Sequence, residues 1–356
     1  MRVGAKATHR AGYNPPEAQC IVGEAAGGRR GRKRRLERGI GEVVGIDARV
    51  QVAGDSLKPP HERLNAIDFL IRAGDFETAE RLLPELAAIP ELSAQVRRLQ
   101  AVVRQLQRWG ISSKVEAYRD PLVRPDGVAT DFDAGDEVRI ARRPGARKIV
   151  FVFTGKARQI WLSIHILHQI LPADCTIVYL QDIRRCGYVF GLQAFGEGYA
   201  ATLDGMRRLI ESEGSPEVFV IGSSAGGWAA MRYALDLEAT RVLAIAPATD
   251  LNVALEHRED LATAIAISKA EGEAGWPPGD MDLRALYASA ARPPELILAF
   301  GGGHERDRDQ CRRMAGLPHV TLHEEPGYDR HDVMAELIAN GSFQHLIDAL
   351  MRPARS

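Results

Sequence analysis

The sequence has few cysteines, almost no net charge and no long apolar segment. Its 356 residues carry 46 Lys and Arg against 47 Asp and Glu, a formal net charge of -1. Such a balance gives no argument from charge for binding nucleic acid or a membrane surface. No C-x-x-C or metal-type spacing occurs, so we expect free thiols and no metal site. The four cysteines are Cys20, Cys175, Cys186 and Cys311.

The sequence also lacks the apolar stretches that mark a membrane-spanning helix or a secretory signal. No stretch reaches the roughly 18 consecutive apolar residues of a membrane-spanning helix. The first residues lack the apolar core of a secretory signal, so we expect a cytoplasmic protein. With 45% hydrophobic and 26% charged residues, the composition is that of a globular chain. The length suits one large domain plus an appendage, and such a core needs no metal or disulfide.

Residues 1–58 are rich in Gly, Arg and Pro and show weak hydrophobic periodicity, which predicts disorder. They include a basic run from Gly27 to Arg35. This run is either a solvated tail or a contact for phosphate backbones. Because no aromatic residues interleave with the charges, nucleic acid is not an expected partner.

Residues 59–110 predict a helical hairpin region. Apolar residues recur at helical spacing on both sides of Gly74-Asp75-Phe76, which ends one helix and caps the next. The pattern resembles one tetratricopeptide-like helix pair, and a further helix is predicted over Gln95–Trp109. We expect these helices to pack on the main domain or on a protein partner.

Residues 111–352 alternate strand and helix, which predicts a mostly parallel α/β sheet flanked by helices. Continuous apolar runs are typical of strands buried on both faces. Strands are expected at Glu137–Ile140, Lys148–Phe153, Cys175–Leu180, Glu217–Ile221, Arg241–Ile245, Glu295–Phe300 and His319–His323. Helices are expected at Ile160–Leu171, Tyr199–Glu213, Trp228–Leu237 and Arg306–Ala315.

An Ala-rich insertion at 250–292 interrupts this alternation and contains the breaker Trp276-Pro277-Pro278-Gly279. It is either a lid over the site or a long connection with its own helices. A lid would exclude water and limit substrate size.

The sharpest motif is Gly222-Ser223-Ser224-Ala225-Gly226, where an apolar strand runs directly into a helix. A G-x-S-x-G turn in this context raises the central serine above the sheet as a nucleophile. Small residues two positions away leave room for the turn, and the helix N-terminus favours a developing oxyanion. Ser224 is therefore the candidate nucleophile; a Gly-rich phosphate-binding turn is the alternative.

A catalytic serine needs a general base and a carboxylate that orients it. His331 follows the last expected strand in a Gly-containing loop, which is where the base belongs. The acid belongs in the loop after Phe300, where Asp307 is the first choice and Glu305 the alternative. Asp309 and Asp250 stay open as lesser choices.

The oxyanion hole needs two backbone amides. One is expected from Ala225, directly after the nucleophile, and the other from Gly155 in the loop after the strand that ends at Phe153. Lys156 in the same loop is either a solvated cation or a contact for an anionic substrate.

At these residues the chain resembles the α/β-hydrolase superfamily over about residues 135–350. The run Leu180-Gln181-Asp182, then Gly191-Leu192, then the Ser224 turn also resembles a bacterial subgroup with an N-terminal helical or tetratricopeptide-like segment. The resemblance implies that Ser224, His331 and Asp307 or Glu305 are nucleophile, base and acid, with no metal and no organic cofactor. The chain departs from the usual pattern at Gly301-Gly302-Gly303-His304, in the acid loop.

The predicted function is a carboxylesterase-like serine hydrolase (EC 3.1 class) that cleaves a carboxylic ester or thioester through an acyl-enzyme. The same residues suit an acyltransferase or a peptidase acting on a small-molecule acyl substrate. The alternative of another class is a non-catalytic interaction protein that binds a partner through the helices at 60–109.

Overall fold

The computed structural model describes residues 46–111, 122, 131–155, 159–214, 216–255 and 281–352. An eight-stranded sheet has the order β1-β2-β4-β3-β5-β6-β7-β8. The pairs β1–β2 and β2–β4 are antiparallel, and all other neighbours are parallel. The strands are β1 (Asp131–Ala134), β2 (Val138–Arg142), β3 (Lys148–Phe153), β4 (Thr176–Leu180), β5 (Glu217–Ser223), β6 (Arg241–Ile245), β7 (Glu295–Gly301) and β8 (Val320–Glu325). The predicted mostly parallel sheet is confirmed.

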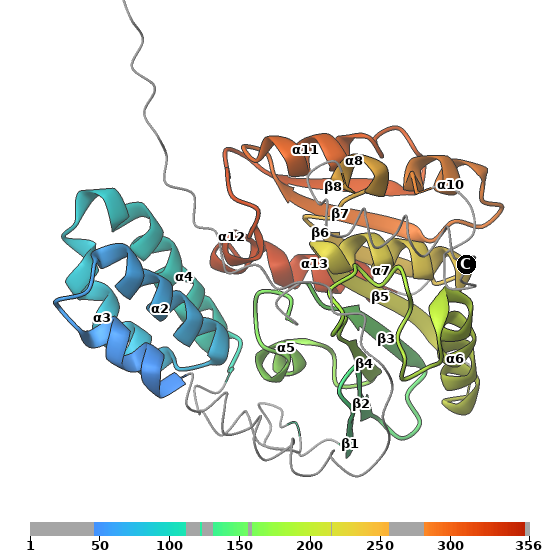
Figure 1. Cartoon of the computed structure of the whole chain (residues 1–356), viewed down its shortest axis with the longest axis horizontal. Helices are drawn as coiled ribbons and strands as arrows, with labels where there is room; N and C mark the ends of the chain where they lie inside the picture. The colour runs from blue at the N-terminus through green and yellow to red at the C-terminus, as the bar shows by residue number, and fades with distance from the viewer. Residues whose placement is uncertain are drawn as a thin grey trace, which may run out of the picture.

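Strand order reverses at β3, which has β4 on one side and β5 on the other. In such sheets a crevice opens at the carboxyl ends of the strands on either side of the reversal. The ends of β3 and β5 therefore mark the expected ligand site. Helices flank the sheet on both faces (Figure 1): α5 (Ile164–Ile170), α6 (Gly198–Ser212), α7 (Ala225–Asp236), α8 (Leu251–Leu255), α10 (Leu283–Ser289), α11 (Glu305–Arg312), α12 (Met334–Ala339) and α13 (Ser342–Leu350).

The central strands β3 to β7 are mostly apolar because both of their faces are buried. Along β3, Val150 and Val152 join the core on one face, whereas Phe151 and Phe153 join the core on the other. All four side chains are fully buried. A period of two thus divides one apolar run between two cores.

The N-terminal helices share the first of these cores. They are α2 (Pro60–Ala73), α3 (Phe76–Ala87), a 3-10 turn (Pro90–Leu92) and α4 (Ser93–Arg108). Gly74 ends α2 with a φ of 95°, and the Asp75 carboxylate caps α3 by accepting the Thr78 N–H at 3.2 Å. The predicted helix pair is confirmed. Figure 1 shows this helical unit beside α12, and its buried residues are continuous with those of α12 and α13.

The boundary of the N-terminal segment is a correction. Residues 46–54 are helical, so the prediction of disorder over 1–58 is wrong for this part. Ile46 and Ala53 are buried against the helical unit, and the Ala53 carbonyl accepts a hydrogen bond from Arg63 Nε at 2.9 Å. Sequence periodicity was too short here to reveal the helix. The basic run from Gly27 to Arg35 lies outside the described residues.

Two further expectations concern the insertion at 250–292 and the cysteines, and the described residues cover each of them in part. Of the insertion at 250–292, expected to be either a lid or a long connection, α8 and α10 are described, and residues 256–280 lie outside the described part. Cys175, Cys186 and Cys311 are free thiols, as predicted, and all three are buried, whereas Cys20 lies outside the described residues. Among the described helices, none is long and apolar enough to span a membrane.

Candidate active site

Ser224 stands at the sharp turn between β5 and α7. Its φ is 53° and its ψ is -119°, a conformation that an L-residue adopts only under strain. The turn is possible because its flanks are glycines: a Cβ at Gly222 would lie 2.4 Å from Ala230 Cβ, and one at Gly226 would lie 2.4 Å from the Phe153 carbonyl oxygen. The motif's small residues are therefore a steric requirement of the turn, which raises Ser224 above the ends of the strands.

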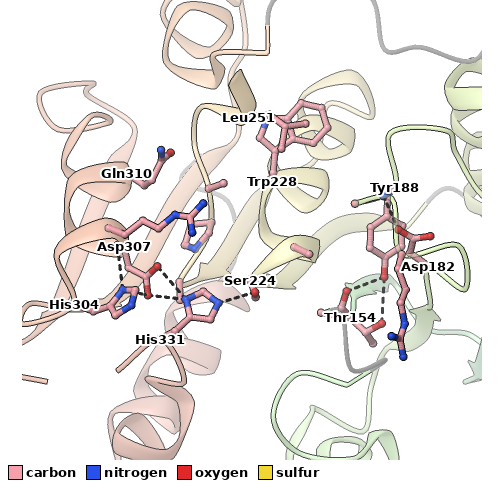
Figure 2. Close-up of a pocket in the computed structure, with 18 residues that line it drawn as sticks. Thr154, Asp182, Tyr188, Ser224, Trp228, Leu251, His304, Asp307, Gln310 and His331 are labelled. Carbon is pink, nitrogen blue, oxygen red and sulfur yellow. Dashed lines mark hydrogen bonds and ion pairs between the residues drawn. The ribbon is translucent and has the colours of Figure 1, made fainter. Parts of the chain in front are cut away.

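Ser224, His331 and Asp307 form one hydrogen-bonded chain (Figure 2). Ser224 Oγ lies 2.7 Å from His331 Nε2. His331 Nδ1 lies 2.8 Å from Asp307 Oδ2 and 3.0 Å from Oδ1. The serine comes from the β5–α7 turn, the histidine from the loop after β8 and the aspartate from α11, so three distant segments converge.

The electrostatics of this chain favour a charged imidazole. Burial lowers the pKa of His331, but the hydrogen bond and negative charge of Asp307 outweigh it, so the pKa is raised above 6.5. Asp307 is almost fully buried, with 5% of its side chain exposed. An ionised carboxylate in that position stabilises the imidazolium that forms when the serine loses its proton.

The other candidate acids lie elsewhere. Glu305 is the exposed first residue of α11, and the exposed Asp309 pairs with Arg308 at 3.4 Å. Asp250 pairs with Arg313 at 2.9 Å. Of the four carboxylates considered, Asp307 is the one that the structure brings to His331.

His304 is a neighbour that sequence reasoning missed. It is the N-cap of α11, and its Nδ1 lies 3.0 Å from Asp307 Oδ2, on the side away from His331 (Figure 2). Its position three residues before the acid, at the start of the helix, was the available signal. Donor atoms of His304, Asp307 and His331 lie within 4.8 Å of one another. Such a donor set suits Zn²⁺, although His331 Nδ1 and the Asp307 carboxylate already bond to each other.

The two backbone amides predicted as oxyanion donors differ in whether an acceptor within the protein already binds their hydrogen. Ala225 is the first residue of α7, so its N–H has no acceptor within the helix. Gly155 lies beside the nucleophile, and a Cβ on it would be 3.7 Å from Ser224 Cβ. However, the Gly155 N–H donates to the Gln159 carbonyl at 3.0 Å. The expectation that this amide faces the substrate is therefore wrong, because the Gln159 carbonyl already accepts its hydrogen. Lys156 lies outside the described residues.

A cavity of about 350 Å³ opens above Ser224. Its apolar lining includes Trp228 and Leu251, which lie together at one side of the pocket (Figure 2). Tyr188 lies across the pocket from Asp307, and its hydroxyl donates to the carbonyl oxygens of Leu180 at 2.8 Å and Thr154 at 2.9 Å. The volume suits a small organic substrate.

No protein-family model and no curated protein sequence matches the chain. Solved structures resemble it at low identity. An esterase of the bacterial hormone-sensitive lipase family is 16% identical, with a TM-score of 0.42, covering 81% of this chain and 96% of its own. The capsule O-acetyltransferase of Neisseria meningitidis serogroup A is 13% identical, with a TM-score of 0.44, covering 62% of this chain and 94% of its own. The serine hydrolase FphF of Staphylococcus aureus is 11% identical, with a TM-score of 0.42, covering 66% and 96%.

At these values the matches carry no inference about activity. The α/β-hydrolase fold is identified by the strand order, by the two antiparallel pairs at one edge of the sheet and by the strand–turn–helix at Ser224.

Proposed function

We propose that this protein hydrolyses a carboxylic ester or thioester through an acyl-enzyme on Ser224. The observation that carries the proposal is the unbroken hydrogen-bond chain from Ser224 Oγ through His331 to the Asp307 carboxylate. The three groups have the contacts that a nucleophile, a base and an orienting acid need.

In the first half-reaction, Ser224 Oγ attacks the acyl carbon while its proton passes to His331 Nε2. The Ala225 N–H, at the N-terminus of α7, donates to the oxyanion that develops. His331 then gives the proton to the leaving alcohol or thiol, and the acyl-enzyme remains. Asp307 holds the ring in the tautomer with hydrogen on Nδ1, which leaves Nε2 free to accept the serine proton.

In the second half-reaction, water loses a proton to the same Nε2 and attacks the acyl carbon. Collapse of the tetrahedral adduct returns the proton to Ser224 and releases the acid. An alcohol or amine in place of water would make the enzyme an acyltransferase, because the acyl-enzyme is common to both.

The test is a chain-length series of chromogenic acyl esters, assayed for released acid with and without an added alcohol acceptor. Ser224→Ala and His331→Ala should each lower kcat by at least about a thousandfold. Ser223→Ala is the matched control, because Ser223 ends β5 one residue away. Unchanged turnover in either triad variant would remove that residue from the mechanism. If an acyl product formed only when the acceptor was present, the activity would be acyl transfer and not hydrolysis.

A further inference from the structure

The loop after β4 builds the wall of the cavity that faces Asp307 across Ser224. Asp182, Arg185, Gly187 and Tyr188 line this wall. Figure 2 shows Asp182 and Tyr188 on the far side of Ser224 from His331 and Asp307. The wall therefore lies where the part of a substrate that extends away from the base would rest.

Two charged side chains of the loop serve to hold its backbone. The Asp182 carboxylate accepts the Tyr188 N–H at 3.0 Å. Burial raises the pKa of Asp182, and the backbone N–H groups around it work in the opposite direction. The Arg184 guanidinium donates to the carbonyl oxygens of Phe190 at 2.7 Å and Gly191 at 2.8 Å. These contacts give the wall a fixed shape.

Arg185 has no such structural use. Its backbone has a φ of 58°, in the left-handed region that L-residues rarely adopt. Across the described ranges, no carboxylate pairs with its guanidinium. An arginine that lines a cavity without an ion pair has its planar guanidinium available for a ligand.

The cavity also carries a second cation. Arg306, the second residue of α11, lines it near His331. The two carboxylates of the lining are already engaged, Asp307 by His331 and Asp182 by the loop backbone. Neither carboxylate pairs with Arg185 among the described residues, so this guanidinium can meet an anionic group of the substrate.

We infer that the substrate carries a carboxylate or a phosphate, and that Arg185 binds it. This inference rests on the proposed function and deepens it by naming the substrate class. A planar guanidinium can hold either group through two parallel hydrogen bonds, so Arg185 would select the charged ester over its neutral analogue.

Three chromogenic esters of similar size test this inference. The first is neutral, 4-nitrophenyl pentanoate. The second has a terminal carboxylate in the acyl chain, mono-4-nitrophenyl glutarate. The third is an aryl butanoate with a phosphate on the leaving group. The wild-type kcat/KM should favour one of the charged esters at least tenfold, and the ester favoured identifies the anion.

Arg185→Gln should lower kcat/KM for that charged ester about 10- to 100-fold and for the neutral ester less than threefold. Arg147→Gln, in the exposed turn before β3, is the matched control and should change neither value. The preference should also weaken as salt is raised. Equal losses on charged and neutral esters, or no wild-type preference, would overturn the inference. The proposed function would survive that result if the neutral ester were still hydrolysed through Ser224.

A second inference comes from a different part of the molecule, the contact between α4 and the loop that carries His331. Tyr328 joins the acid loop to the base loop. Its carbonyl accepts the Gly303 N–H at 2.9 Å, and its hydroxyl donates to the Asp332 backbone oxygen at 3.1 Å. A Cβ at Gly301 would lie 2.5 Å from the Tyr328 carbonyl oxygen, which explains the glycine run that departs from the usual pattern.

Arg98 of α4 holds this loop from outside. Its guanidinium carbon lies 4.7 Å from the centroid of the Tyr328 ring, and its Nε lies 2.6 Å from Glu336 Oε2. Tyr328 precedes His331 and Glu336 follows it on α12, so one side chain bridges both ends of the turn. A cation over an aromatic face and a half-buried ion pair both fix geometry.

The structure assigns Arg98 as a positioning residue for His331, and this assignment also rests on the proposed function. Arg98→Met keeps the aliphatic stem but removes both polar contacts, and should lower kcat about tenfold or more with little change in KM. Arg98→Lys should restore part of the loss. Arg97→Met, exposed on the same helix, is the control.

A purely structural role makes a different prediction. If Arg98→Met lowered the melting temperature but left kcat and the acidic limb of the pH profile at wild-type values, the positioning role would be wrong. The proposed triad would survive that result, because labelling of Ser224 in the wild-type protein tests it separately.

Discussion

Replacing Asp307 by asparagine removes the negative charge of the site and keeps the shape of the side chain. In the wild type both carboxylate oxygens lie within 3.0 Å of His331 Nδ1, and 5% of the Asp307 side chain is exposed. An asparagine N–H pointing at Nδ1 would favour the tautomer with hydrogen on Nε2. That tautomer cannot accept the Ser224 proton, and the imidazolium would lose its nearest negative charge.

The equivalent change in a serine protease triad lowers kcat about 10⁴-fold, which corresponds to roughly 5.4 kcal/mol. We expect Asp307→Asn to lower kcat by about 10³- to 10⁴-fold, with KM changed only slightly. The buried charge here is engaged by two hydrogen bonds to the base, so a smaller loss would not be consistent with its role. Circular dichroism and a melting curve would show that the fold persists.

The matched control is Glu305→Gln, which makes the same chemical change on an exposed residue of the same helix. Its kcat should stay within twofold of wild type on the ester that the wild type hydrolyses fastest. The reasoning would be refuted if Asp307→Asn kept more than a tenth of the activity, or if Glu305→Gln lost as much as Asp307→Asn.

Three further predictions follow from pKa shifts and close packing. Because the pKa of His331 is raised above 6.5 and the base must be neutral, kcat/KM should fall as pH drops through a midpoint above 6.5; a midpoint below 6.5 would contradict this. Gly226→Ala should abolish turnover or lower the free energy of unfolding by about 1–3 kcal/mol, because its Cβ would lie 2.4 Å from the Phe153 carbonyl oxygen, whereas Gly54→Ala meets nothing within 4 Å and should be neutral. Burial, with the charges of Arg139 and His168, lowers the pKa of His165 to about 3 in the folded protein. As pH falls below 6.5, His165 therefore becomes protonated in the unfolded chain but not in the folded one, and this favours unfolding. Between pH 7.5 and 5 urea unfolding should therefore show a loss of about 2 kcal/mol that His165→Gln lacks; equal acid losses in both proteins would refute it.

The sheet and the position of the nucleophile were predictable because each depends on local pattern. A continuous apolar run such as Lys148–Phe153 leaves few alternatives to a buried strand, and β3 has those same bounds. The Gly222–Gly226 motif encodes a steric requirement of one turn, so it can be recognised without knowing the rest of the chain.

The remaining features depend on contacts between distant segments. Asp307 and Glu305 are two residues apart, and their difference lies in which one the start of α11 directs inward. The Gly155 amide donates to the Gln159 carbonyl, a contact that the sequence did not signal. The strand β1 was not predicted, because its four residues pair only with β2 at the edge of the sheet.

The central claim is that Ser224 is the nucleophile, and covalent labelling tests it most directly. The full-length protein would be treated with a fluorophosphonate probe, digested and mapped by mass spectrometry, beside Ser224→Ala and Ser223→Ala. We predict one adduct per chain, on the peptide that contains Ser224, retained in Ser223→Ala and absent from Ser224→Ala. Well-folded wild-type protein that stays unlabelled, or an adduct that persists in Ser224→Ala, would contradict the account.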